Sequence, residues 1–170
     1  TGLASVKSEV SEIISLHRVA RLRAERGMPA TSITRHLVFT GNPGTGKTTV
    51  LNLITGELRP DHGAILFKGG DIFGWPAFRI CRAGIARTFQ LVRVLPFMTA
   101  RENVMLGRMF GSEPTEPTQA AHEADALIER VGLTARAALH ASQLTYIDQK
   151  RLELARALAS RPQLLLLDEW

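Results

Sequence analysis

Apolar residues recur along the chain at two spacings, one typical of helices and one of strands. Spacings of three and four residues are typical of helices with one buried face, and they run through residues 3–26, 49–56, 78–84, 99–109, 120–131 and 146–160. Short apolar runs of strand length lie between them, at residues 37–40, 64–67, 85–89 and Leu164–Leu167. Helical and strand segments in this order predict an α/β fold, which we expect to be a three-layer sandwich with a mainly parallel sheet.

The strand predicted at residues 37–40 runs directly into a glycine-rich loop that a helix follows. The loop matches G-x-x-x-x-G-K-[ST] in full, through Gly41, Asn42, Pro43, Gly44, Thr45, Gly46, Lys47 and Thr48. Its glycines let backbone N–H groups turn inward, and the helix N-terminus completes an anion site. We expect Lys47 to reach the β- and γ-phosphates of ATP, Thr48 to ligate Mg²⁺ and Thr49 to support the α-phosphate.

A second candidate for the same site comes after the last apolar strand. Leu164–Leu167 is followed directly by Asp168 and Glu169, and ligands of open α/β sheets bind at the carboxyl ends of the strands. We expect Asp168 to hold Mg²⁺ through water and Glu169 to orient or deprotonate the attacking water as a general base. Together with the loop, the pair predicts a P-loop NTPase site for ATP and Mg²⁺.

Composition is that of a globular protein and limits the other classes. The chain has 170 residues, of which 45% are hydrophobic and 22% charged, and this length predicts one domain, residues 1–170. No apolar run approaches a membrane span, and the first residues lack a signal-peptide pattern. Cys81 is the only cysteine, which fits a reducing cytosol. The net charge of +5 comes mostly from dispersed arginines, so we expect no nucleic acid partner.

From residue 51 onward the chain resembles the ATP-binding subunits of ABC transporters, in particular the branched-chain amino acid uptake group. The matching stretches follow the family's order and spacing, at residues 51–60, 79–90, 99–104, 144–158 and 164–169. By this resemblance Gln90 is the Q-loop glutamine, whose amide touches Mg²⁺ and the attacking water. The family's signature motif corresponds to Leu144, Thr145, Tyr146, Ile147 and Asp148.

The resemblance also implies an organisation and a set of roles. It implies a nucleotide-binding core at residues 37–91 and 161–170 and a helical subdomain at residues 92–160. Lys47, Gln90 and Glu169 are then catalytic, and Thr48, Gln90 and Asp168 surround the metal. The implied partners are ATP, a membrane permease docked near Gln90 and residues 91–102, and a second ATP-binding chain in an ATP-dependent dimer. The implied location is cytoplasmic and peripheral, on the inner face of the cell membrane.

The first 50 residues resemble a different group of ATPases. Residues 1–7, the arginine-rich helix 3–26 and residues 36–49 are similar to AAA ATPases of the red-type RuBisCO activase and type VII secretion kind. ABC subunits normally carry Gly-Pro-Asn-Gly where this chain has Gly41-Asn-Pro-Gly44, and their adenine-stacking segment has no match in residues 1–36. We therefore expect a chimera or fragment, with an AAA-like helix and linker at residues 1–36 and the change of family near the loop.

Several departures from the ABC pattern bear on turnover. Ile147 stands where the signature normally has glycine, and the chain has no D-loop or switch histidine after Glu169. In this ATPase class a later strand usually separates the loop-bearing strand from the strand that ends in Asp-Glu. We therefore expect an incomplete sheet, with a gap between residues 37–40 and Leu164–Leu167 and marginal stability.

Three hypotheses for function follow from these features. The first is an ATPase that supplies energy to an ABC-type amino acid importer, possibly in truncated form. The second is a AAA-type remodelling ATPase that assembles as a ring, which the first 50 residues favour. The third is a nucleotide-binding fragment without useful turnover, which Ile147 and the absent D-loop favour.

Overall fold

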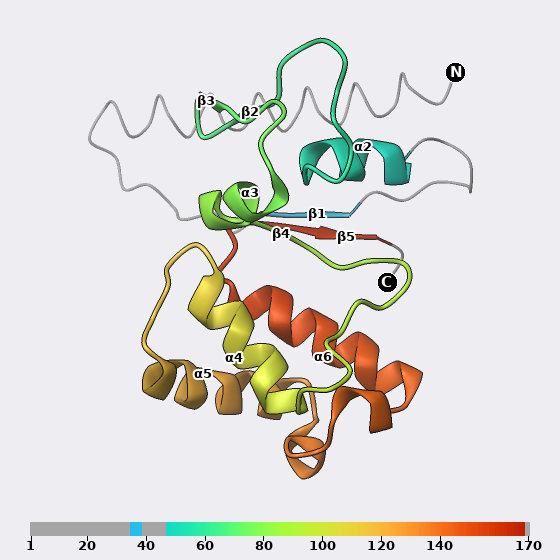
Figure 1. Cartoon of the computed structure of the whole chain (residues 1–170), viewed down its shortest axis with the longest axis vertical. Coiled ribbons are helices and arrows are strands. Elements are labelled where there is room, and N and C mark those ends of the chain that lie inside the picture. The colour runs from blue at the N-terminus through green and yellow to red at the C-terminus, as the bar shows by residue number, and fades with distance from the viewer. Residues whose placement is uncertain (1–34, 39–46, 169–170) are drawn as a thin grey trace. The chain divides into compact units, whose positions relative to one another are not determined.

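The computed structural model describes residues 35–38 and 47–168, with side chains from residue 48 onward (Figure 1). The helices and strands of this part lie close to the segments that the apolar spacing predicts, including three successive α-helices before the last strand. In chain order the elements are β1 (Arg35–Val38), α2 (Lys47–Ile54), β2 (Leu66–Phe67), β3 (Gly70–Asp71), α3 (Ala77–Ala83), β4 (Ile85–Arg87), α4 (Ala100–Phe110), α5 (Pro117–Arg130), η1 (Thr134–Arg136), η2 (Ala141–Gln143), α6 (Tyr146–Ala159) and β5 (Leu164–Leu167). The helix predicted at residues 3–26 lies outside the described residues.

Within the described residues, three parallel strands form the central sheet, in the order β1-β5-β4. Val38 is opposite Leu167 in one pair of strands, and Arg87 is opposite Leu166 in the other. The predicted gap between the loop-bearing strand and Leu164–Leu167 is therefore wrong, because β1 pairs directly with β5 along four residues. Direct pairing satisfies backbone N–H and C=O groups that a gap would leave without partners.

Alternate residues of β4 and β5 bury their side chains on opposite faces of the sheet. Leu166 and Ile85 pack with Leu51 of α2 and Ile80 of α3. Leu165 and its neighbour Ala86 pack instead with Ala157 of α6. This two-residue period places helices on both faces, as the predicted three-layer arrangement requires, with α2 and α3 above the strands and α6 below them in Figure 1.

A separate two-stranded hairpin joins α2 to α3. Leu66 and Phe67 of β2 pair antiparallel with Gly70 and Asp71 of β3. The turn residues Lys68 and Gly69 both have positive φ, 53° and 79°, which is the backbone that a two-residue hairpin turn of type I′ requires. The strand predicted at residues 64–67 is limited to Leu66–Phe67 in the structure, and its partner is the neighbouring strand β3.

Helices α4, α5 and α6 form their own apolar core. Its central side chains, Val104, Leu133 and Leu152, are fully buried. Helices α4 and α6 cross so closely that a Cβ on Gly107 would lie 2.4 Å from the carbonyl oxygen of Arg156. Only glycine fits at that crossing, so the packing of α4 on α6 depends on this residue.

Local signals in the sequence account for where these helices begin. Thr99 caps α4 in a reciprocal capping box with Glu102, and Pro117 occupies the first position of α5, where its missing N–H has no cost. None of the helices described in residues 47–168 has both the length and the apolar character that crossing a membrane requires.

Candidate nucleotide site

The carboxyl ends of all three parallel strands lie at one edge of the sheet, because the register keeps them nearly level. Strand β1 ends at Val38 and helix α2 begins at Lys47, so the predicted loop connects these two elements. Asp168 follows the last residue of β5, and Gln90 comes three residues after the end of β4. The three sequence-predicted groups therefore leave the sheet at the same edge, which is where open α/β sheets bind ligands.

The structure describes only part of the predicted phosphate and metal site. Thr48 and Thr49 lie in the first turn of α2 with exposed side chains, at the helix N-terminus where backbone N–H groups attract anions. Outside the described part lie Gly41, Asn42, Pro43, Gly44, Thr45, Gly46, the side chain of Lys47, and Glu169. The roles assigned to them stay predictions.

Asp168 is buried and forms an ion pair with Arg87. Its Oδ2 accepts a hydrogen bond from Nη2 of Arg87 at 2.6 Å, and the side chains of Arg87 and Asp168 are 4% and 6% exposed. Nη1 of Arg87 donates to Oδ1 of Asn52 at 2.6 Å and to Oγ1 of Thr55 at 3.3 Å. One guanidinium thus joins the end of β5 to helix α2.

Arg87, Asn52 and Thr55 are the residues that sequence reasoning missed. The only available signal was Arg87 itself, a charged residue inside the apolar strand segment 85–89. An arginine that is buried in such a strand needs an anionic partner. Arg87 also lies over the ring of Phe89, with 4.8 Å from Cζ to the ring centroid, so the guanidinium is held on several sides.

The backbone at Gln90 is held by the helix that follows the signature-like residues. Nζ of Lys150 donates to the carbonyl oxygens of Phe89 and Gln90, at 3.1 and 3.0 Å. The hydroxyl of Tyr146 donates to the same Gln90 carbonyl at 3.4 Å. The structure therefore brings the predicted Q-loop glutamine next to the predicted signature segment within one chain.

The signature-like residues form the start of helix α6. Leu144 is buried, and Thr145 caps the helix by accepting a hydrogen bond from the Asp148 N–H. Asp148 is itself buried and pairs with Arg136 and Arg151, each at 3.3 Å. Ile147 is 64% exposed, so the residue that replaces a family glycine presents its side chain at the surface.

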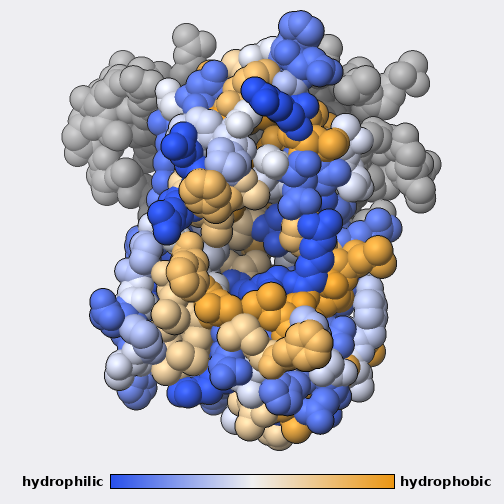
Figure 2. All heavy atoms as spheres, in the orientation of Figure 1, coloured by the Kyte–Doolittle hydropathy of each residue, from blue (hydrophilic) through white to orange (hydrophobic). Residues whose placement is uncertain are grey.

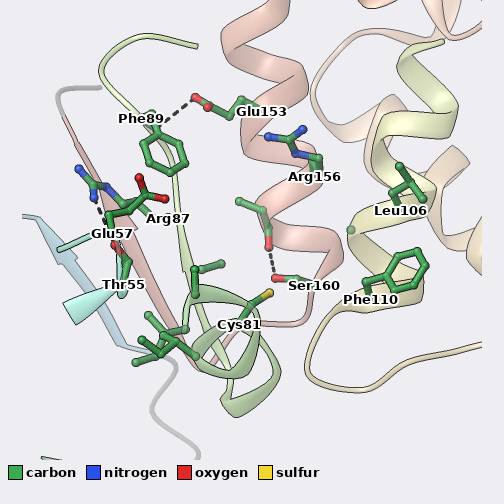
Figure 3. A pocket seen from close by; sticks show the side chains of 16 residues that line it. Thr55, Glu57, Cys81, Arg87, Phe89, Leu106, Phe110, Glu153, Arg156 and Ser160 are labelled. Carbon is green, nitrogen blue, oxygen red and sulfur yellow. Dashed lines mark hydrogen bonds between the residues drawn. The ribbon is translucent and has the colours of Figure 1, made fainter. Parts of the chain in front are cut away.

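A cavity of about 340 Å³ lies between α3 and β4 on one side and α4 and α6 on the other. Figure 2 shows a hollow bordered by apolar side chains, and Figure 3 shows Arg87, Phe89, Glu153 and Arg156 around it. Burial lowers the pKa of Arg156, although the nearby Glu153 opposes the change. Asp168 and Gln90 do not line this cavity, whereas Arg87, the ion-pair partner of Asp168, does.

The chain is similar to known proteins in both sequence and structure. The family model described as "ABC transporter" matches residues 32–170. The branched-chain amino acid transport ATP-binding protein LivG of Escherichia coli K12 is 38% identical over 142 residues, which is 76% of this chain and 56% of LivG. BraF of Pseudomonas aeruginosa is 39% identical over 143 residues, with the same coverage. The chain thus spans about half the length of these relatives.

Solved structures give the same result for the fold. A nucleotide-free ATP-binding cassette from an ABC transporter matches with a TM-score of 0.61 and 28% identity, over 78% of this chain and 56% of that one. A cassette in its ADP conformation matches with a TM-score of 0.60 and 29% identity, over 76% and 55%. The sequence match begins at residue 32 and so includes the glycine loop, while the AAA-like origin of the N-terminal segment stays a prediction.

Proposed function

The chain belongs to the ABC transporter family, and from this premise we propose that it binds and hydrolyses ATP to supply energy to an importer. The observation that carries the proposal is the common edge of the sheet, where the loop, Asp168 and Gln90 follow three parallel strands. The names of LivG and BraF support a branched-chain amino acid as the transported substrate.

The residues at this edge suit Mg²⁺ and a triphosphate. The oxygen donors are the exposed hydroxyl of Thr48, the carboxylate of Asp168 and the amide of Gln90, and Mg²⁺ prefers such ligands together with phosphates and water. Arg87 contacts one carboxylate oxygen of Asp168, which fits a role through water for the other. When bound, Mg²⁺ neutralises charge on the phosphates.

The protein groups perform the remaining tasks. Lys47 and backbone N–H groups of the glycine-rich loop hold the phosphates, and Thr49 supports the α-phosphate. Glu169 orients the attacking water and accepts its proton, and Gln90 positions that water. Hydrolysis of this kind depends on positioning and electrostatics, with no covalent intermediate on the protein.

We further propose that the chain works as two subdomains, with a core at residues 37–91 and 161–170 and a helical part at residues 92–160. The separate apolar core of α4, α5 and α6 supports this division. The exposed start of α6, at Tyr146 and Ile147, is then the surface that meets a second ATP-binding chain. The branched side chain of Ile147 crowds this surface, so dimer formation by this chain is weak.

The membrane partner is a permease that docks beside Gln90, and the complex places the chain at the cytoplasmic face of the membrane. Exposed apolar side chains in the following segment support this surface, since Leu91 is 78% and Phe97 89% exposed. Phe97→Ser should abolish co-purification with the permease subunits of a branched-chain amino acid importer. Leu66→Ser is the matched control, because Leu66 is 71% exposed on the β2–β3 hairpin.

The activity is tested by measuring ATP binding and phosphate release together. Lys47→Ala should weaken ATP binding about tenfold to hundredfold, the equivalent of about 1.5–3 kcal/mol from hydrogen bonds to a charged group. Glu169→Gln should bind ATP but release no phosphate. Lys68→Ala serves as the control, because Lys68 donates to the Ala83 carbonyl in another part of the chain.

Two results of this experiment decide against the proposal in different ways. If Lys47→Ala binds ATP as well as the parent chain, the loop is not the nucleotide site. If the parent binds ATP but releases no more phosphate than Glu169→Gln, the chain is a nucleotide-binding fragment without turnover.

A further inference from the structure

The segment that carries Gln90 changes its hydrogen-bonding partners abruptly after one residue. The N–H of Thr88 donates to the carbonyl of Leu166 at 3.0 Å, which continues the sheet. The next N–H, that of Phe89, donates to Oε2 of Glu153 on α6 at 3.3 Å. The chain therefore passes from the sheet to helix α6 between Thr88 and Phe89.

Side chains of the helical part hold the backbone that follows. Oε1 of Glu153 accepts from the N–H of Arg93 at 2.9 Å, so one carboxylate binds the chain on both sides of Gln90. Glu153 is 1% exposed, and a buried carboxylate is stable only with such donors. Figure 3 shows its contact with Phe89 across the edge of the cavity.

Lys150, one helical turn before Glu153, completes the attachment. Its Nζ donates to the carbonyl oxygens of Phe89 and Gln90, while Glu153 accepts from the N–H groups. Residues i and i+3 lie on the same face of a helix, so α6 presents one cation and one anion to opposite polar groups of the backbone. Links back to the core are weaker, since the Arg93–Glu57 pair has an arginine that is 58% exposed.

We propose that Lys150 and Glu153 are positioning residues for Gln90. They fix Gln90 to helix α6, so any displacement of α6 relative to the sheet changes the distance between the Gln90 amide and Asp168. The same helix begins at the signature-like residues, where the hydroxyl of Tyr146 also donates to the Gln90 carbonyl, so that end of α6 is joined to the Gln90 segment as well. The inference rests on the proposed function for the role of Gln90, whereas the attachment itself is independent of that role.

Kinetics of ATP hydrolysis by the chain tests the positioning role. Lys150→Met should lower kcat about tenfold, the size expected for one hydrogen bond to a charged group, with little change in the KM for ATP. Lys150→Arg should restore most of the rate, because arginine also donates to carbonyl oxygens. Lys68→Met is the matched control, since Nζ of Lys68 also donates to a backbone carbonyl, that of Ala83, at 3.0 Å.

A double-variant comparison separates positioning from general destabilisation. If Lys150 acts through Gln90, Lys150→Met should have no further effect on kcat in a Gln90→Ala background. Independent, additive losses in the two variants would overturn the proposal, and so would an unchanged kcat in Lys150→Met.

Amide exchange followed by NMR tests the attachment without any ATPase activity. In Glu153→Gln the side chain keeps one acceptor oxygen, so one of the two N–H groups, at Phe89 or Arg93, loses its partner and should exchange about tenfold faster. Unchanged exchange at both would overturn the attachment. If the parent chain releases no phosphate, the proposed function fails. The exchange rates of the Phe89 and Arg93 amides then test the attachment alone. If Glu153→Gln does not fold, the Lys150 variants decide.

Discussion

The centre of the helical part and the carboxyl edge of the sheet are stabilised by different kinds of contact. The core of α4, α5 and α6 is apolar, with Val104 and Leu152 fully buried at its centre. The sheet has apolar layers too, but at its carboxyl edge it buries the charged pair of Arg87 and Asp168. A buried ion pair contributes less to stability than apolar side chains of the same volume.

This difference indicates what each part is for. The centre of the helical part follows the rule that the interior is apolar. Its buried charged side chains, Arg108, Asp148 and Glu153, are outside that apolar cluster and have ionic or hydrogen-bonding partners. The edge of the sheet departs from that rule at Asp168, and such departures are typical of functional sites. The Gln90 segment connects the two parts, because its backbone leaves the sheet at Thr88 and is bound by Glu153 of the helical part.

The largest expected effect on stability comes from breaking the buried pair at the sheet edge. Arg87→Met should cost about 3–5 kcal/mol of unfolding free energy, because it leaves the buried carboxylate of Asp168 without its cation. Urea denaturation measures the change. Arg101→Met is the control, since Arg101 pairs with Asp125 at the surface and should lose no more than about 1 kcal/mol. Equal losses in the two variants would contradict the contrast between interior and surface.

An apolar truncation in the helical core should have the next largest effect. Leu152→Ala removes a fully buried side chain and should cost about 3 kcal/mol, from lost burial and the cavity left behind. Leu152→Met, with a similar volume, should cost less than about 1.5 kcal/mol. Thermal unfolding followed by circular dichroism compares them. A Leu152→Ala variant as stable as Leu152→Met would show that this core is not tightly packed.

The close crossing of α4 and α6 can be tested with a single methyl group. Gly107→Ala places a Cβ 2.4 Å from the Arg156 carbonyl oxygen, so the helices must separate, at a cost of about 1–2 kcal/mol. Alanine otherwise favours a helix over glycine by about 1 kcal/mol, so a stabilised variant would contradict the close contact. Thr118→Ala, at an exposed position of α5, is the control and should be neutral or slightly stabilising.

The smallest predicted effect is an acid dependence of the helical part. A hydrogen bond from Arg108 lowers the pKa of Glu123 below its ordinary value near 4.5. The stabilisation is therefore complete above pH 4.5 and is lost as the pH falls through the lower pKa of the folded state. Glu123→Gln should remove about 0.5 kcal/mol at neutral pH and flatten the loss of stability below pH 4.5. A parent and variant with parallel pH profiles would refute this assignment.

The sequence predicted the helices better than it predicted the pairing of the strands. Helices are set by local spacing and caps, so α4 and α6 begin within one residue of the predicted positions, and Leu164–Leu167 is a strand with the predicted bounds. Strand pairing depends on contacts between distant residues, and here the predicted gap beside Leu164–Leu167 was wrong. Family resemblance supplied the expected gap, and the apolar pattern of a strand cannot say which strand lies next to it.

In the candidate site, the sequence predicted positions along the chain but not side-chain partners. Motif and strand position predicted that Asp168 and Gln90 would follow strands, and the sheet places both at one edge. The partners of these residues could not be predicted, because Arg87, Lys150 and Glu153 reach them through side-chain contacts across the fold. Burial and the direction of a long side chain depend on how the whole molecule packs. Residue spacing alone does not predict them.

The most direct test of the account is the pattern of backbone protection when Mg²⁺ and ATP are added. Hydrogen exchange read by mass spectrometry should show slower exchange in three peptides together, those that contain residues 41–49, residues 88–93 and Asp168. Lys47→Ala should lose the protection in all three, because one ligand joins them at the sheet edge. Protection around the cavity beside Cys81 and Phe110, with no change in the three peptides, would contradict the account.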